Sequence, residues 1–345
     1  MAYEGVVSDF QAIRACRVPS RVPCVSLSEE FDVRWHGKYS YEEFCQDGDK
    51  MVEVCRAAID AFDYDWAWLQ VDDCFEFEPI GVGVKGEGNI LRATYRYLEP
   101  TLETLARLPT MDPLRDGRMP EKLKAIRQLR SIYGDSVLVV GSCAAPFSAV
   151  GLMWGIEESM VLLASDPELL SAEMEYWLAF YKRYIKAQKE AGSHAIWLGD
   201  CNAFSGMVSV EQYTSRIFPV TKRLVDYAER ELGIMVWLHN SEVSVNHVRS
   251  HLPLGASIES IGPGGDMAQI RAATRGRQAV SGNLDPLEVL WRGSPATIAR
   301  EVERLMTVCK EGGGYVFATG EMNPRDVPAE NMAAMMQAAK RLSVY

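Results

Sequence analysis

The stretches AIWLGD at 195–200 and MVWLH at 235–239, with the segment between them, decide the fold of this chain. Both stretches are apolar up to their last residues, which is typical of strands buried on both faces of a parallel sheet. Between them, 210–232 carries apolar residues at helical spacing, so we expect a helix there. A strand, a helix and a second strand in this order predict one βαβ unit of a parallel sheet.

The same alternation extends over most of the chain and predicts one α/β domain. We expect helices over 49–62, 121–133, 167–191 and 295–310 as well. Eight strands alternating with helices favour a closed barrel over an open sheet, so the sequence predicts a single (β/α)8 TIM barrel spanning 1–345. The eight expected strands are 22–27, 66–71, 136–143, 195–200, 235–239, 256–261, 279–284 and 315–320.

Two segments fall outside this repeat. Residues 1–20 precede the first expected strand and are predicted to be an N-terminal extension. The interval after the second strand is too long for one loop, so we expect an insertion or lid over 72–118. The insertion contains GVGVKG at 81–86, a GxGxxG pattern that does not open a helix after a first strand, and we interpret it as a flexible loop.

Composition limits the classes of partner. The chain has 345 residues, 47 acidic against 36 basic, and a formal net charge of -11. This balance would repel phosphates, so neither nucleic acid nor an anionic membrane surface is an expected partner. Apolar runs are broken by charges before they reach membrane-spanning length, and the eight cysteines form no CxxC pair. We predict a reduced, cytoplasmic protein.

The chemistry of such barrels lies at the carboxyl ends of the strands. His239 ends one expected strand and could be a metal ligand or a general acid/base, or a structural histidine at the edge of the core. Glu321, after the eighth strand, could bind a hard metal or cap a helix, and acidic residues after the second strand could bind substrate or act as N-caps. The strand-end residues that we single out are Glu29, Asp72, Asp73, Cys143, Asp200, Cys201, His239, Asn240, Glu259, Asn283 and Glu321.

Five segments carry a resemblance to a known family. They read GSCAAPFSAVGLMWGIEE (141–158), IWLGDCNAFSGMVSVEQY (196–213), VWLHNS (236–241), SGNLDPLEVLWRGSPATIAREV (281–302) and FATGEMNPRDVPAENMAAMMQAAK (317–340). In order and register they resemble the uroporphyrinogen decarboxylase (URO-D) superfamily, and most of all its corrinoid-dependent methyltransferases of the methylcobalamin:coenzyme M type. The likeness runs from about 21 to 341 and implies the barrel fold.

The decarboxylases of this superfamily carry an arginine-rich segment near the N-terminus that holds the carboxylates of the tetrapyrrole. The equivalent stretch here is VPCVSLSEEFDVRW, with Glu29 and Glu30 where cations would be expected. A polycarboxylate would meet repulsion there, so the resemblance does not favour uroporphyrinogen as the substrate.

The related methyltransferases share a zinc motif, His-x-Cys at the end of the fifth strand and a second Cys after the eighth. Here the histidine is His239, whereas Ser241 and Glu321 stand at the cysteine positions. The resemblance thus implies zinc on His239 and Glu321, with Glu259, Asp200 or Cys201 as further ligands. Losing both thiolates makes the site harder and favours oxygen compounds over thiols.

We therefore predict a corrinoid-dependent methyltransferase that demethylates an O-methyl donor onto a Co(I) corrinoid. Zinc would polarise the ether oxygen, or His239 or Glu321 would protonate it without metal. Asp72 is a third expected catalytic residue, and the expected substrate-binding residues are Glu29, Asp73, Cys143, Asn240 and Asn283.

The partners and the alternatives follow from the same resemblance. The Asp-x-His-x-x-Gly signature of corrinoid proteins is absent, so cobalamin should arrive on a separate corrinoid protein, and a homodimer is compatible with the sequence. One alternative is transfer from a methyl-corrinoid to a thiol or folate. A second is a metal-free decarboxylase or lyase that protonates a carbanion with Asp72 or His239. A third is a binding protein without enzymatic activity.

Overall fold

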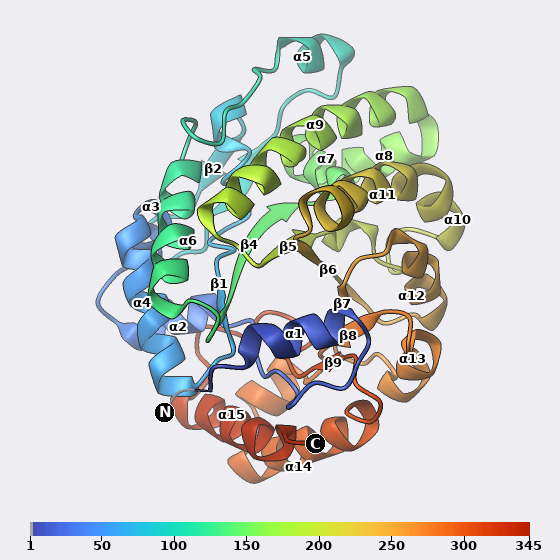
Figure 1. Ribbon diagram of the computed structural model, residues 1–345. Coiled ribbons are helices and arrows are strands. Elements are labelled where there is room, and N and C mark those ends of the chain that lie inside the picture. The colour runs from blue at the N-terminus through green and yellow to red at the C-terminus, as the bar shows by residue number, and fades with distance from the viewer. Residues whose placement is uncertain (1–2) are drawn as a thin grey trace.

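A computed structural model describes residues 3–345 and shows a curled sheet of seven parallel strands surrounded by helices (Figure 1). Neighbouring strands follow one another in chain order, so each strand pairs with the next one of the sheet. The strands are β1 Trp66–Trp68, β4 Leu138–Ala144, β5 Ala195–Gly199, β6 Met235–Glu242, β7 Ile258–Ile261, β8 Ala279–Ser281 and β9 Tyr315–Val316. Seven of the eight predicted strands are thus present, with β1, β8 and β9 shorter than expected.

The predicted first strand, 22–27, is an extended segment rather than a strand of the sheet. Its backbone forms an isolated parallel bridge between Cys24 and Phe317, just beyond β9. On its other side, Asp65 N donates a 3.0 Å hydrogen bond to Cys24 O, just before β1. This segment therefore links the two edges of the curled sheet, with two backbone hydrogen bonds to Phe317 on one side and bonds to Asp65 on the other.

Helices cover the outside of the sheet, and their ends carry the expected signals. In α9 the Asp166 side chain accepts a hydrogen bond from Leu169 N, Pro167 is the first helical residue, and Gly192 ends the helix in a left-handed conformation. The helices are α1 Val6–Arg14, α2 Glu29–His36, α3 Tyr41–Gln46, α4 Gly48–Phe62, α5 Leu102–Arg107, α6 Met119–Tyr133, α7 Pro146–Trp154, α8 Ile156–Ser165, α9 Pro167–Ala191, α10 Val210–Gln212, α11 Phe218–Asp226, α12 Val245–His251, α13 Met267–Thr274, α14 Pro295–Cys309 and α15 Ala329–Ser343.

The predicted helix over 210–232 is present as one continuous helical segment, but two of its parts are π-helical. The structure has α10, a π-helical turn at Tyr213–Ile217, α11, and a second π-helical turn at Tyr227–Leu232. Pro219 lies in the first turn of α11 and lacks the N–H that a continuous α-helix would use, which accounts for the π-helical turn before it.

Four tryptophans fill the interior of the sheet below the strand ends. Trp66, Trp68, Trp197 and Trp237 are all at most 4% exposed, and neighbouring rings lie 5.1–5.8 Å apart. The predicted N-terminal extension contains α1, whose Phe10 is fully buried 6.0 Å from the Trp237 ring. The aromatic layer thus fills the interior beneath the strand ends. The space for a site therefore lies above it, at the carboxyl ends of the strands.

The segment between β1 and α6 contains the extra structure that the long interval predicted. It includes an antiparallel pair, β2 Gly83–Lys85 and β3 Ala93–Arg96, followed by α5. The loop expected over 81–86 is therefore wrong, because three of its residues form β2. Among residues 3–345, no helix combines the length and the apolar character needed to cross a membrane.

Candidate active site

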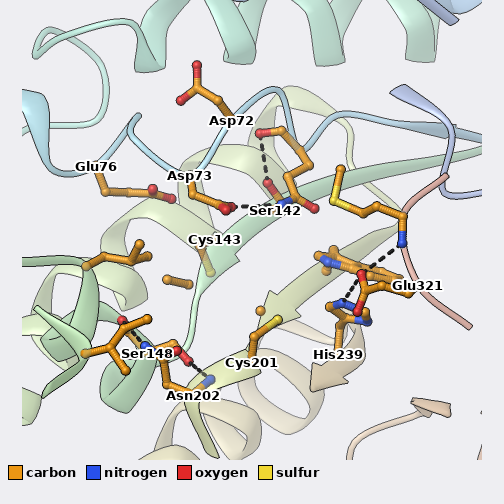
Figure 2. A pocket seen from close by; sticks show the side chains of 17 residues that line it. Asp72, Asp73, Glu76, Ser142, Cys143, Ser148, Cys201, Asn202, His239 and Glu321 are labelled. Carbon is orange, nitrogen blue, oxygen red and sulfur yellow. Dashed lines mark hydrogen bonds and ion pairs between the residues drawn. The ribbon is translucent and has the colours of Figure 1, made fainter. Parts of the chain in front are cut away.

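A cavity of about 340 Å³ opens at the carboxyl ends of β4, β5 and β6 (Figure 2). One wall comes from the loop after β1, and the opposite wall comes from the ends of β5 and β6 and the segment after β9. The cavity is lined by Gln70, Asp72, Asp73, Glu76, Ser142, Cys143, Ala144, Ser148, Leu152, Ile156, Trp197, Gly199, Cys201, Asn202, His239, Glu321 and Met322. Six of the predicted site residues are therefore brought together here.

His239 and Glu321 form an ion pair in this cavity, although 82 positions separate them in the chain. His239 Nε2 lies 3.5 Å from Glu321 Oε1. Ser241 Oγ donates a hydrogen bond to Glu321 Oε2, and Met322 N donates one of 2.9 Å to Oε1. Ser241 has a positive φ of 52°, which turns the chain at the end of β6. The two residues at the family's cysteine positions thus contact each other beside the histidine.

The electrostatics of the pair favour its charged form. Burial acts to lower the pKa of His239, but Cys201 and Glu321 outweigh it and raise that pKa to about 10. Burial acts to raise the pKa of Glu321, but His239 and Ser241 lower it to about 2. The His239 ring also stacks on Trp197, with ring centroids 4.4 Å apart. At neutral pH the site therefore holds an imidazolium and a carboxylate.

Asp72 lines the cavity but is neutralised by arginine. Arg118 donates two hydrogen bonds to its carboxylate, of 2.8 and 3.0 Å, and Arg92 lies 3.7 Å away. Such a bidentate pair uses the lone pairs of the carboxylate. The expectation that Asp72 exchanges a proton with substrate therefore does not fit the structure. Asp72 instead binds the Arg118 guanidinium.

Asp73 and Glu76 follow Asp72 on the same wall. Asp73 accepts a 2.8 Å hydrogen bond from Gln70 Nε2, and desolvation by the cavity walls raises its pKa. Glu76 is 4% exposed, and burial raises its pKa to about 7, against the opposing effect of Lys122. Sequence reasoning missed Glu76, because it lies beyond the strand end in DDCFEF and no periodic pattern singles it out.

Cys143 and Cys201 differ in their exposure. Cys143, near the end of β4, is 4% exposed, and burial raises its pKa well above the ordinary value of a thiol. A thiol of this kind stays protonated and unreactive at neutral pH. Cys201 follows β5, is exposed to the cavity, and lies on the same side as His239 (Figure 2).

Five predicted site residues lie outside the cavity lining. Glu29 accepts a 2.6 Å hydrogen bond from Val71 N, and Asn283 Nδ2 donates to the carbonyls of Gly262 and Gly265. Asn240 is 1% exposed and follows His239, which lines the cavity, so the strand turns the Asn240 side chain to the other face. These three residues, which the sequence predicted to bind substrate, therefore do not line the cavity.

The two expected carboxylate metal ligands also lie behind the cavity wall. Glu259 is fully buried, with Oε1 2.7 Å from His251 Nδ1. Asp200 is fully buried and accepts a 3.1 Å hydrogen bond from Ser148 Oγ, so it reaches the cavity only through Ser148. Both side chains point away from His239, because side chains of neighbouring strand positions alternate between the two faces.

The side chains present do not fit the zinc that the resemblance implies. In the described part of the chain, no three His, Cys, Asp or Glu side chains are arranged to hold a metal ion. A protein zinc site needs three or four such ligands. His239 Nε2 and Glu321 are instead paired with each other, and Ser241 donates to Glu321, while Nδ1 of His239 has no partner among the described residues. The chemistry proposed for this site therefore uses the side chains alone.

Comparisons with known proteins agree with this architecture. The family model for uroporphyrinogen decarboxylase (URO-D) matches residues 9–342. A methylcobamide:CoM methyltransferase, MtbA, of Methanosarcina acetivorans is 26% identical over 96% of this chain and 96% of its own. A uroporphyrinogen decarboxylase of Trichlorobacter lovleyi is 27% identical over 92% and 91%. The solved structure of a methyltransferase from Methanosarcina mazei superposes with a TM-score of 0.86 at 19% identity, covering 97% of this chain and 98% of that one.

Proposed function

Because the chain belongs to the uroporphyrinogen decarboxylase family, we propose that it is one of the family's corrinoid-dependent methyltransferases and that it demethylates an O-methyl compound. The methyl group would pass to a reduced corrinoid carried by a separate protein. The observation that carries the proposal is the His239–Glu321 ion pair in the cavity at the strand ends. The choice of an oxygen donor over a thiol rests on Ser241 and Glu321 at the positions of the family's zinc-binding cysteines.

The difficulty of the reaction lies in the leaving group. The reduced corrinoid supplies the electron pair that bonds to the methyl carbon, while the C–O bond breaks and its electrons stay on oxygen. An alkoxide or phenolate leaves slowly unless its charge is neutralised. The His239 imidazolium gives the Nε2 proton to that oxygen instead of to Glu321 Oε1, 3.5 Å away, so the demethylated compound departs as an alcohol or phenol.

The pKa of His239 suits this role. A pKa of about 10 keeps the imidazolium protonated through the neutral range. It is also close to that of a phenol, about 10 as in tyrosine, so proton transfer to a leaving phenolate is nearly balanced in energy. Glu321 stabilises the imidazolium charge, and the Trp197 ring stacked on it fixes the orientation of the donor.

The experiment is to mix the protein with cobalamin reduced to Co(I) and with methoxylated aromatics, methanol or methylated thiols, and to record the corrinoid spectrum. We expect conversion to methylcobalamin with a methoxylated compound. In His239→Gln the rate of this conversion should fall by about 100-fold or more. His194→Gln is the matched control, because His194 lies at the opposite end of β5, beside Asp135. Methyl loss from methylcobalamin to a thiol, without conversion by any O-methyl donor, would instead support the alternative direction.

A further inference from the structure

Glu76 is a buried carboxyl group whose hydrogen bond within the protein comes from its own backbone N–H. It is 4% exposed, and among residues 3–345 its side chain forms no hydrogen bond or ion pair with another side chain. Figure 2 shows it directed into the cavity, on the side opposite His239. A buried polar group without a partner is costly, and buried carboxylates are nearly always hydrogen-bonded. The acceptor sites that its own N–H leaves open therefore face what occupies the cavity.

The neighbouring cation does not supply that partner. Lys122 Nζ donates to Ser142 Oγ at 2.6 Å and to the carbonyl oxygens of Ser142 and Gln70 at 3.1 and 3.4 Å. These three acceptors use the three hydrogens of the ammonium group. Lys122 therefore influences Glu76 only through its charge, and leaves the carboxyl oxygens open toward the cavity.

The charged groups around the cavity limit the chemical classes of ligand that can bind there. No lysine or arginine belongs to its lining in the described part of the chain. The nearest arginines, Arg92 and Arg118, are held by Asp72 and Glu78. Asp73 adds a second carboxyl group to the wall that carries Glu76, and the charge of His239 is balanced by Glu321. An anionic group near Glu76 would meet repulsion from Glu76 and Asp73, and the hydrogens of Lys122 are already bonded to Ser142 and Gln70 rather than open to the ligand.

We infer that Glu76 binds a hydroxyl or ammonium group of the substrate at the end remote from its methyl group. This inference rests on the proposed function, since it takes His239 as the site of methyl loss. The substrate class is then a small methyl ether with a neutral or cationic hydrogen-bond donor, and carboxylated ethers are excluded. The cavity volume of about 340 Å³ lies at the lower end of ligand sites and suits a compound of this size.

The test uses two matched series of methyl ethers whose far end differs. The first is 4-methoxybenzylamine, 4-methoxybenzyl alcohol, 4-methylanisole and 4-methoxybenzoate, and the second is 2-methoxyethylamine, 2-methoxyethanol and methoxyacetate. Binding to the full-length protein is measured by calorimetry, without corrinoid. We expect the amine and the alcohol to bind about tenfold or more tightly than 4-methylanisole, and the carboxylates to bind most weakly.

The variants assign the preference to one residue. Glu76→Gln should reduce the advantage of the amine over the carboxylate by about tenfold or more. Glu30→Gln makes the same charge change on the rim but outside this cavity, beside Arg325, and should leave the preference unchanged. Equal binding of amine and carboxylate to the native protein, no binding by either series, or an unchanged preference in Glu76→Gln would overturn the inference. A preserved preference without methyl transfer to cobalamin would contradict only the proposed function.

Discussion

Replacing Glu321 with glutamine should move the basic limb of the pH–rate profile to lower pH. Two unit charges 3.5 Å apart attract by about 5 kcal/mol at an effective dielectric constant of about 20. The Glu321 side chain is 39% exposed, so solvent screening leaves about half of this, or about 2.5 kcal/mol. At about 1.4 kcal/mol for each pKa unit, the pKa of His239 should fall by about two in the variant.

The sign follows from the charge that is removed. Glu321 raises the pKa of His239, so without it the imidazolium loses its proton at a lower pH. The native rate of methyl transfer should stay level through neutral pH and fall only near pH 10, where His239 loses its proton. The variant should begin to fall about two pH units earlier, because its imidazolium is less stabilised.

The assay is the single-turnover rate of cobalamin methylation from pH 6 to 11, together with NMR titration of the His239 ring. Ser241→Ala is the control, because it removes a hydrogen bond to Glu321 but keeps the carboxylate. Its basic limb should lie close to that of the native protein. Identical limbs in the native protein and Glu321→Gln would refute the electrostatic reasoning, whatever the change in absolute rate.

Four further predictions concern the same site and its support. Trp197→Leu removes the ring stacked on His239 and should lower the methyl-transfer rate by about tenfold, as measured in the same cobalamin assay; an unchanged rate would show that the ring does not orient the donor. Arg118→Ala leaves Asp72 buried without its partner and should lower the free energy of unfolding by about 3–5 kcal/mol, checked by urea denaturation. The stabilisation that His239 contributes should be complete below pH about 6.5 and lost as the pH rises through about 10, whereas that of Glu321 should be lost as the pH falls from about 4.5 through about 2. The melting temperatures of the native protein and of His239→Gln should therefore converge at alkaline pH. Dialysis against a strong chelator should leave the melting temperature unchanged, since the described residues assemble no three-ligand site, and a large fall would contradict that interpretation.

Sequence patterns were most informative where backbone periodicity and burial decide the structure. Seven of the predicted strands coincide with continuous apolar runs, because a parallel sheet buries its strands on both faces. The bounds of α9 coincide with the predicted 167–191, where Pro167 begins the helix and Gly192 ends it. Six of the eleven residues singled out at strand ends line one cavity. Which of them face the cavity depends on the side to which each strand turns its side chains, and a shift of one position reverses that side.

That dependence explains the errors at Asn240 and Glu259. Asn240 lies next to His239 in the chain, yet adjacent positions of a strand face opposite sides. Glu259 is on the next strand and pairs with His251 of α12, a contact that no local pattern reveals. The ion pairs of Asp72 likewise depend on Arg118, which lies 46 positions away. Contacts between residues so far apart in the chain become visible only in the three-dimensional structure.

Glu76 shows the opposite limit, a residue that sequence patterns did not mark at all. It follows β1 in an irregular loop, where the position of a side chain is set by the turns at Cys74 and Phe77 rather than by any repeat. Its burial and its lack of a side-chain partner appear only when α6 and α9 are packed against the loop. A carboxyl group in such surroundings is a better indicator of function than its position in the sequence.

The most direct test of proton donation by His239 is the dependence of the methyl-transfer rate on the leaving group. Single-turnover rates to Co(I) cobalamin would be measured for aryl methyl ethers whose phenols span several pKa units, with the native protein and His239→Gln. We predict a shallow dependence in the native protein, because the imidazolium neutralises the departing oxygen, and a steep one in the variant. Equal slopes in the two proteins would contradict the assignment of His239 as the acid.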